Sequence, residues 1–432
     1  MRLPYAEVEF DKKGALVHPE QVKDAARLLA DEKATDVIVI SHGWNNTFDN
    51  ARALYEGLVS SIVAVRGSVA RAADRRLVVV GVLWPSILWA PPDDDKGGGA
   101  GLGDEADALR AQLEEQIEDP ARRAKLIALI PSLDSSAAAR AEFVELLREK
   151  LPDGAVDDDD PDSAPMALKT ADAEDLFQAA GGGEGFAAAG GAEGGGGGGA
   201  AGLDPMGAGQ EAVGGGAGFS LGGLLDAARN VVNVTTYFTM KDRAGSVGSS
   251  GLATLLESLH AAAPDARLHL VGHSFGGRAV TAAALATSAP VSSVSLLQAA
   301  YSHFGMAQGW DGAKANGAFW KVPGKVQGPV IVTFTKNDKA VGLAYPVASR
   351  IANQIGAGLG DAGDKYGGIG RNGALKTPSG LPAAKLLDVG GEYRFEKGRV
   401  SSLDGDRFIS GHSDITGKQV AYAVLSAVTT MG

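Results

Sequence analysis

Short runs of β-branched and aliphatic residues, separated by stretches with helical spacing, constrain the fold of this chain most strongly. Asp36–Ser41 (DVIVIS) and residues 77–84 (LVVVGVLW) are almost wholly apolar, as expected of strands that are buried on both faces of a parallel sheet. The stretch between them, helical over Phe48–Val65, is long enough for a parallel crossover. The pattern predicts a strand–helix–strand frame in residues 1–90.

The same alternation extends over most of the remaining chain. Further strands are expected at residues 5–10, 267–271, 291–298, 330–335 and 385–388, and further helices at residues 19–32, 249–262, 277–287, 343–355 and 415–430. Three segments are less regular: residues 12–17 as a return strand for 5–10, residues 393–402 as a hairpin, and residues 224–240, helical in pattern but strand-like in composition at 234–238. We therefore predict an α/β fold, with a mostly parallel sheet flanked by helices and one large insertion.

Residues 91–220 differ from the rest of the chain in charge and in glycine content. They carry 27 Asp or Glu against 9 Lys or Arg, whereas the other 302 residues carry 25 against 31. Glycine makes up 61 of the 432 residues, about twice the usual share, and 21 of them lie in residues 181–223. We interpret residues 1–90 and 221–432 as two parts of one α/β domain. Residues 91–220 are then an acidic, glycine-rich insertion, placed where a lid could cover the domain's site.

The insertion leaves two interpretations open. Its helical stretches, residues 104–118, 121–130 and 137–150, carry apolar residues that either shelter an apolar part of a ligand or form a small core of the insertion itself. These residues include Leu126, Ile127, Leu129, Ile130, Phe143 and Leu146. The Asp run at 157–160 lacks the glycine and glutamate spacing of an EF-hand loop and is interpreted as a solvated linker. The glycine run at 194–199 is not followed by the Gly-Lys-Ser/Thr of a phosphate-binding loop.

Composition excludes several classes of function. The chain has no cysteine, which removes disulfides, thiolate nucleophiles and Cys-ligated zinc. No basic stripe is present, so a nucleic-acid partner is not expected. The N-terminus lacks the apolar segment of a secretory signal, and no run of about 20 apolar residues predicts a transmembrane helix. A cytoplasmic protein is expected, with export by a specialised system and transient contact with a membrane surface left open.

Residues 271–277, Val-Gly-His-Ser-Phe-Gly-Gly, contain the pattern G-x-S-x-G with Ser274 at its centre. An apolar strand precedes this motif and an alanine-rich helix follows it, which is the context of a nucleophile elbow. Small residues are needed there because the chain turns sharply from strand to helix and presents the serine hydroxyl at the sheet edge. We predict that Ser274 is a nucleophile; the alternative is a tight turn with an incidental serine.

A serine nucleophile needs a base, because a free hydroxyl is hardly ionised at neutral pH. Of the seven histidines, His412 lies in a polar loop before the last helix and is the predicted base. His303, which follows a strand end, is the rival, whereas His269 lies within a strand and is expected in the core. Asp338 follows a strand end and is predicted to orient the imidazole. The weaker candidates for this acid are Asp311, Asp388 and Asp414, the last of which is expected to cap the final helix.

Two backbone N–H groups must face the oxyanion that forms during acyl transfer. One is expected from Phe275, the residue after the nucleophile. The other is expected from Trp44, because the strand at Asp36–Ser41 ends in His42-Gly43-Trp44 and Gly43 allows a close approach of the backbone. His42, Gly43 and His273 are predicted to border the bound substrate.

Together these residues resemble the α/β-hydrolase superfamily. The resemblance rests on Ser274 in GHSFG, Asp338 after the next strand but one and His412 near the end, in the order nucleophile, acid, histidine. His42-Gly43-Trp44 resembles the superfamily's His-Gly-x oxyanion loop, and HGWNNTFDNA with residues 83–86 (LWPS) is similar to a bacterial esterase/lipase-like branch. The resemblance covers residues 35–90 and 225–432, and the insertion has no counterpart in it.

The resemblance implies hydrolysis of a carboxylic ester, lipid esters among them, through an acyl-enzyme. Ser274 would attack, His412 would take and return the proton, and Asp338 would hold His412, while Trp44 and Phe275 would bind the oxyanion. It implies a small-molecule or lipid ester as substrate, and neither a metal nor an organic cofactor. Three alternatives stay open: a thioesterase or acyltransferase with the same machinery, an exported lipid-degrading effector, and a non-catalytic binding protein with this fold.

Overall fold

One sheet organises the part of the chain that the structure describes. The computed structural model describes residues 3–44, 46–86, 102–149, 151, 166–181, 221–312, 314–338 and 367–431. Its eight strands lie in the order β1-β3-β2-β4-β5-β6-β8-β7, and every neighbouring pair is parallel. The strands are β1 (Tyr5–Glu9), β2 (Asp36–Ser41), β3 (Leu77–Leu83), β4 (Arg267–His273), β5 (Val291–Leu297), β6 (Val330–Phe334), β7 (Ala384–Lys385) and β8 (Val400–Asp404).

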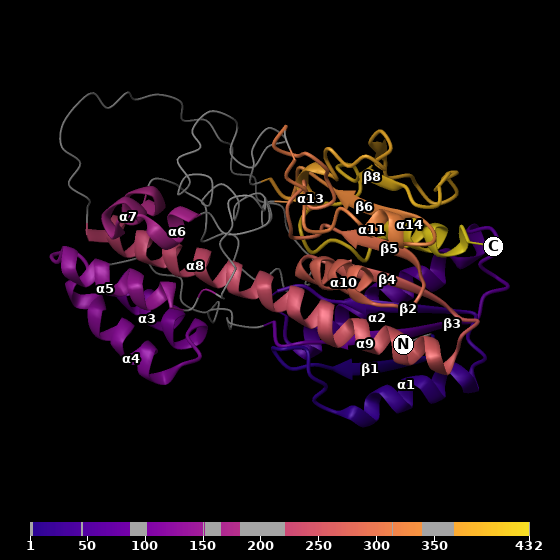
Figure 1. Cartoon of the computed structure of the whole chain (residues 1–432), viewed down its shortest axis with the longest axis horizontal. Coiled ribbons are helices and arrows are strands. Elements are labelled where there is room, and N and C mark those ends of the chain that lie inside the picture. Colours follow the sequence, from indigo (N-terminus) through magenta and orange to yellow (C-terminus); the bar gives the residue numbers. More distant parts are fainter. Residues whose placement is uncertain are drawn as a thin grey trace.

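Helices cover both faces of this sheet (Figure 1), which confirms the α/β class. One face carries α1 (Pro19–Asp31), α9 (Ala253–Ala262) and α10 (Phe275–Ala286), and the other carries α2 (Phe48–Val65) and α14 (Lys418–Thr429). The short helices α11 (Val322–Lys325) and α13 (Ile369–Asn372) lie in the connections around β6.

Strand β2 shows why its residues form an unbroken apolar run. Successive side chains of a strand point to opposite faces. Val37 and Val39 therefore belong to the core on the α1 side, and Ile38 and Ile40 to the core on the α2 side. Because both cores are closed by helices, neither face of the strand tolerates polar residues at these positions.

A second group of helices stands beside the sheet and is joined to it by one long helix (Figure 1). This helical group consists of α3 (Leu102–Gln116), α4 (Pro120–Leu129), α5 (Ala137–Arg148), α6 (Met166–Thr170), α7 (Ala173–Gly181) and the first part of α8 (Leu221–Ser246). Helix α8 runs from the group to the sheet and continues through a π-helical turn, Val247–Leu252, into α9.

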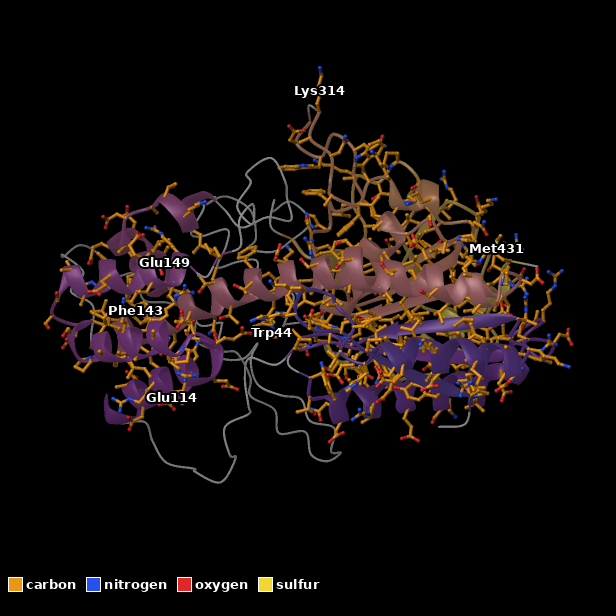
Figure 2. The ribbon with its side chains drawn as sticks, turned by 60° about the horizontal axis from the view of Figure 1, so that its bottom comes forward. Trp44, Glu114, Phe143, Glu149, Lys314 and Met431 are labelled. Atoms are coloured by element: carbon orange, nitrogen blue, oxygen red, sulfur yellow. The ribbon has the colours of Figure 1, made fainter. Side chains whose placement is uncertain are left out.

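The apolar residues of the insertion are buried among its helices, in a core that is continuous with the one on the α1 side of the sheet. Leu126, Ile130, Phe143 and Leu146 are buried, and the ring of Phe143 meets that of Phe177 edge to face, with 6.4 Å between centroids. Figure 2 labels Phe143, which is buried within the helical group, and Glu114 and Glu149, which are exposed. Of the two interpretations of this apolar face, burial within the insertion is therefore the one observed for these four residues.

Charged contacts tie the helical group to the sheet domain. Glu118, which follows α3, pairs with Lys12 and with Arg243 of α8, both at 2.7 Å. Arg243 also donates to the main-chain oxygen of Pro85, just beyond β3, at 2.9 Å. Arg243 is buried while Glu118 is 46% exposed, so the guanidinium joins the end of α3 to the loop after β3 at the edge of the interface.

The three less regular segments have different outcomes. Residues 234–238 are helical within α8, as the helical pattern of residues 224–240 indicated, and burial between the helical group and the sheet overrides their strand-like composition. Residues 12–17 return beside the end of β1 with one antiparallel bridge, Phe10 with Leu16, but they form no strand of their own. Residues 393–402 form no hairpin, since β8 pairs in parallel with β6 and β7.

The final helix begins at Lys418 and not at residue 415. The helix predicted at residues 343–355, the Asp run at 157–160 and the glycine run at 194–199 lie outside the described residues. None of the helices that the structure describes is both long and apolar enough to cross a membrane.

Candidate active site

Ser274 lies at the sharp turn between β4 and α10, at the carboxyl edge of the sheet. Its φ of 55° and ψ of −126° belong to a backbone region that non-glycine residues rarely adopt. Two residues on, a Cβ on Gly276 would collide with the main-chain oxygen of Ser41 at the end of β2. The small residues of the motif thus allow β2 to pass close to the turn, and the strand-to-helix geometry expected of the motif is present.

Main-chain hydrogen bonds hold Ser274 in this conformation. Its N–H donates to the carbonyl of Leu297 at 3.2 Å, and its own carbonyl accepts from the N–H groups of Gly277 at 2.9 Å and Ala300 at 3.0 Å. A strained residue persists only where its surroundings enforce the conformation. Here the end of β5 and the first turn of α10 supply that restraint.

The structure brings Ser274, His412 and Asp338 together from three separate loops. Nε2 of His412 lies 2.8 Å from Oγ of Ser274, and Nδ1 lies 2.8 Å from Oδ2 of Asp338. A carboxylate can only accept, so Nδ1 carries the hydrogen and Nε2 of the neutral ring accepts from the serine hydroxyl. This arrangement can move the hydroxyl proton to His412 while the buried carboxylate stabilises the imidazolium.

The loop that carries Asp338 is bonded to the loop after β8. Asp406 accepts from the hydroxyl of Thr335 at 2.9 Å and from the N–H of Lys336 at 2.8 Å. The side chain of Asn337 donates to the main-chain oxygen of Ile409 at 2.8 Å. Because Ile409 lies three residues before His412, the acid and the histidine are positioned by one continuous network.

Two buried side chains form hydrogen bonds with the main-chain carbonyl of His412. Nε2 of His273 donates to the carbonyl of His412 at 2.9 Å, and the amide nitrogen of Gln298 lies 3.4 Å from the same oxygen. The amide oxygen of Gln298 in turn accepts from Thr333 at 2.7 Å. Sequence reasoning missed Gln298, although a polar residue at the carboxyl end of a buried strand is a signal of the kind that identified Asp338.

The loop after β2 lies directly against Ser274. A Cβ on Gly43 would overlap the side chain of Ser274, so glycine is required for this approach. The side-chain amide of Asn46, which sequence reasoning also missed, donates to the carbonyls of Gly43 at 3.2 Å and Trp44 at 3.0 Å. On the other side, Phe275 begins α10, and an N–H in the first turn of a helix has no acceptor within that helix. Both residues expected to supply oxyanion donors therefore flank Ser274.

His42 fixes this loop from inside. Its ring is fully buried and stacks on Trp84, with 5.3 Å between centroids. Nε2 accepts from the N–H of Trp84 at 3.3 Å, and Nδ1 donates to the carbonyl of Gly43 at 2.9 Å. Burial lowers the pKa of His42 to about 4, so the ring is neutral. The contacts of His42, Gly43 and His273 with a substrate stay predictions.

Helix α8 reaches the site through an aromatic side chain. The ring of Tyr237 lies beside those of Trp44 and Phe275, with centroid distances of 6.4 and 5.0 Å. Figure 2 shows Trp44 where the helical group meets the sheet domain. Nothing in the local sequence of α8 indicates this contact, because it depends on how the insertion packs.

A second Ser-His-Asp set lies at the opposite edge of the sheet. Nδ1 of His269 lies 2.8 Å from Oγ of Ser293, and Nε2 lies 3.1 Å from Oδ1 of Asp36, which also pairs with Arg75 at 3.5 Å. Ser293, His269 and Asp36 are completely buried. The expectation that His269 belongs to the core is confirmed, and this set links strands β2, β4 and β5.

The remaining candidates lie elsewhere. Nδ1 of His303, the rival base, lies 3.0 Å from the side-chain amide of Asn372. Asp414 accepts from the N–H and hydroxyl of Ser410 at 2.9 and 2.8 Å. The expectation that Asp414 caps the final helix is therefore wrong, because Gly417 occupies the N-cap of α14.

No cluster of three or more histidine, aspartate or glutamate side chains suited to a metal ion occurs among the described residues. No protein-family model, curated protein or solved structure matches the chain.

The backbone of Ser274 leads to a specific order of stabilities. Ser274→Ala keeps the strain, whereas Ser274→Gly relieves about 1–3 kcal/mol of it and loses about 0.4–1 kcal/mol through a more flexible unfolded chain. We expect the glycine variant to be more stable than the alanine variant by about 1 kcal/mol in urea unfolding. At Ser293, which lies in a regular strand, the alanine variant should be the more stable one. If the glycine and alanine variants had the same order of stability at both positions, the backbone of Ser274 would not be strained.

Three buried histidines lead us to expect a loss of stability in mild acid. Burial lowers the pKa of His42 to about 4, that of His273 to about 3 and that of His269 below its usual value. In the unfolded chain each binds a proton near pH ~6.5, so each lowers the free energy of unfolding by about 1.4 kcal/mol per pH unit below that point. Burial raises the pKa of Glu115 to about 7, so the folded protein takes up one proton there as the pH falls. This single proton offsets only part of the stability lost through the three histidines.

Urea unfolding at a series of pH values from about 7.5 down to about 5 measures this dependence. The free energy of unfolding should decrease throughout that range. A constant or increasing stability would show that the three histidines are not held neutral in the folded protein.

Proposed function

We propose that the protein is a serine hydrolase of the α/β-hydrolase type that cleaves carboxylic esters through an acyl-enzyme. The observation that carries the proposal is the alignment of Ser274, His412 and Asp338 by two hydrogen bonds of 2.8 Å at a strained strand-to-helix turn. The parallel sheet flanked by helices supports it, as does the chain order nucleophile, acid, histidine.

The reaction begins when Oγ of Ser274 attacks the carbonyl carbon of the ester and its proton passes to Nε2 of His412. The former carbonyl oxygen becomes an oxyanion, which the N–H groups of Trp44 and Phe275 stabilise. As the bond to the leaving alcohol breaks, His412 returns the proton to the alcohol oxygen and the acyl group stays on Ser274. Water then attacks this acyl-enzyme with His412 again as base, which releases the acid and restores Ser274.

The surroundings of His412 favour this direction of proton transfer. Asp338 is fully buried, so its carboxylate faces the ring without competition from solvent. His273 lies beside His412, with 4.8 Å between ring centroids. Burial together with the neighbouring His412 lowers the pKa of His273 to about 3. The proton taken from Ser274 therefore stays on His412 and is available to the leaving group.

Turnover of 4-nitrophenyl acetate and butyrate by triad variants tests the proposal. Ser274→Ala and Asp338→Asn should each lower kcat by about 10³-fold or more, because one removes the nucleophile and the other the partner that orients the base. The matched control is Asp388→Asn, an exposed acid that accepts from Gln419 at 2.9 Å; its kcat should stay within about twofold of wild type. Wild-type protein should also release a stoichiometric burst of nitrophenol before steady state.

Full activity in Ser274→Ala would rule out the assignment of the nucleophile. Equal losses in Asp338→Asn and Asp388→Asn would show that the acid has no specific role.

A further inference from the structure

Tyr237 contacts both residues whose backbone N–H groups are the proposed oxyanion donors. Its ring centroid lies 6.4 Å from that of Trp44 and 5.0 Å from that of Phe275, and these two lie 6.0 Å from each other. Tyr237 is 5% exposed and Phe275 is 1% exposed. The three rings form a closed triangle beside Ser274, in which Tyr237 and Phe275 are buried and Trp44 is partly exposed, and Tyr237 comes from α8.

The two donors are not fixed equally by the sheet domain. Phe275 is the first residue of α10 and follows the hydrogen-bonded turn at Ser274. Trp44 lies in an irregular loop, where the side chain of Asn46 donates to its carbonyl at 3.0 Å. Trp44 therefore depends more than Phe275 on what its ring packs against, and Tyr237 supplies an edge-on contact there.

Helix α8 is held on both sides of Tyr237. On the side of the helical group, Gln112 of α3 donates to Asn233 at 2.8 Å and Thr236 donates to Gln116 of α3 at 2.7 Å, and all four side chains are buried. On the side of the sheet, Arg278 of α10 donates to the carbonyl of Lys241 at 2.9 Å. The place of Tyr237 against Trp44 is thus set jointly by the insertion and by the helix that follows the nucleophile.

From this geometry we propose that Tyr237 is a positioning residue for the oxyanion hole, through which the helical group sets the rate of the reaction at Ser274. The inference rests on the proposed function. Tyr237 acts through Trp44: its ring holds the loop so that the Trp44 N–H stands where the oxyanion forms. Donors act at about 2.7–3.1 Å from that oxygen, and a displacement of about 1 Å costs about 100-fold in rate.

A purely structural role for Tyr237 leads to a different result. Loss of a packed ring would then lower stability and leave kcat of the folded protein unchanged. Phe238 separates the two roles, because it lies next in α8, is 4% exposed and meets Tyr237 edge to face at 5.3 Å. Its ring is not part of the triangle with Trp44 and Phe275.

Steady-state kinetics with 4-nitrophenyl butyrate and inhibition by an alkylboronic acid test the proposal on the full chain. Tyr237→Met should lower kcat about 10–100-fold while KM changes less than about threefold. Boronic acid binding should weaken by the same factor as kcat/KM, because an oxygen of the tetrahedral boronate occupies the oxyanion position. Tyr237→Phe keeps the ring and should stay within about twofold of wild type, and so should kcat of Phe238→Leu.

Unchanged kcat in folded Tyr237→Met, or an equal loss of kcat in Phe238→Leu, overturns the positioning role. If Tyr237→Met does not fold, Gln116→Leu replaces it, because this change removes the acceptor of Thr236 and loosens α8 from the helical group. An unchanged kcat in folded Gln116→Leu would likewise overturn the positioning role. Wild-type protein that neither turns over the ester nor binds the boronic acid overturns the proposed function and this inference together. Active wild-type protein with unaffected variants overturns this inference alone.

Discussion

Ser274 holds a backbone conformation, φ 55° and ψ −126°, that costs about 1–3 kcal/mol unless its neighbours enforce it. Those neighbours are the ends of two strands beside β4. The end of β2 crosses the turn where Gly276 offers no Cβ, and the end of β5 accepts from the Ser274 N–H through Leu297. The same crossing presses Gly43 against Ser274. The strained serine and the loop beside it are therefore one packing unit, and neither can relax without the other.

The parallel sheet explains how much of this could be predicted from the sequence. The carboxyl ends of parallel strands meet at one edge, so polar residues after β4, β6 and β8 could be expected to meet even though 138 residues separate Ser274 from His412. The residues that hold these loops in place could not be predicted from the sequence in the same way. Gln298 and Asn46 act through main-chain carbonyls of neighbouring loops, and such contacts follow from loop geometry that spacing in the sequence does not encode.

Two further features show why residue types alone are insufficient. A second serine, histidine and aspartate, Ser293, His269 and Asp36, lie at distances from one another similar to those in the candidate site. All three are nevertheless completely buried, at the opposite edge of the sheet. A regular strand carries Ser293, whereas a strained turn presents Ser274. Helix α8 shows the converse: its strand-like stretch at 234–238 becomes helical and carries Tyr237 to the site, because long-range packing of the insertion decides its conformation.

The central claim is that the environment of Ser274 activates this one hydroxyl as a nucleophile. Intact-mass measurement after treatment with a fluorophosphonate tests it most directly, with wild type and Ser274→Ala compared under identical conditions. We expect one adduct per wild-type chain and none on the variant, although Ser293 and its histidine are present in both. An adduct on folded Ser274→Ala, or none on folded wild type, would contradict the claim.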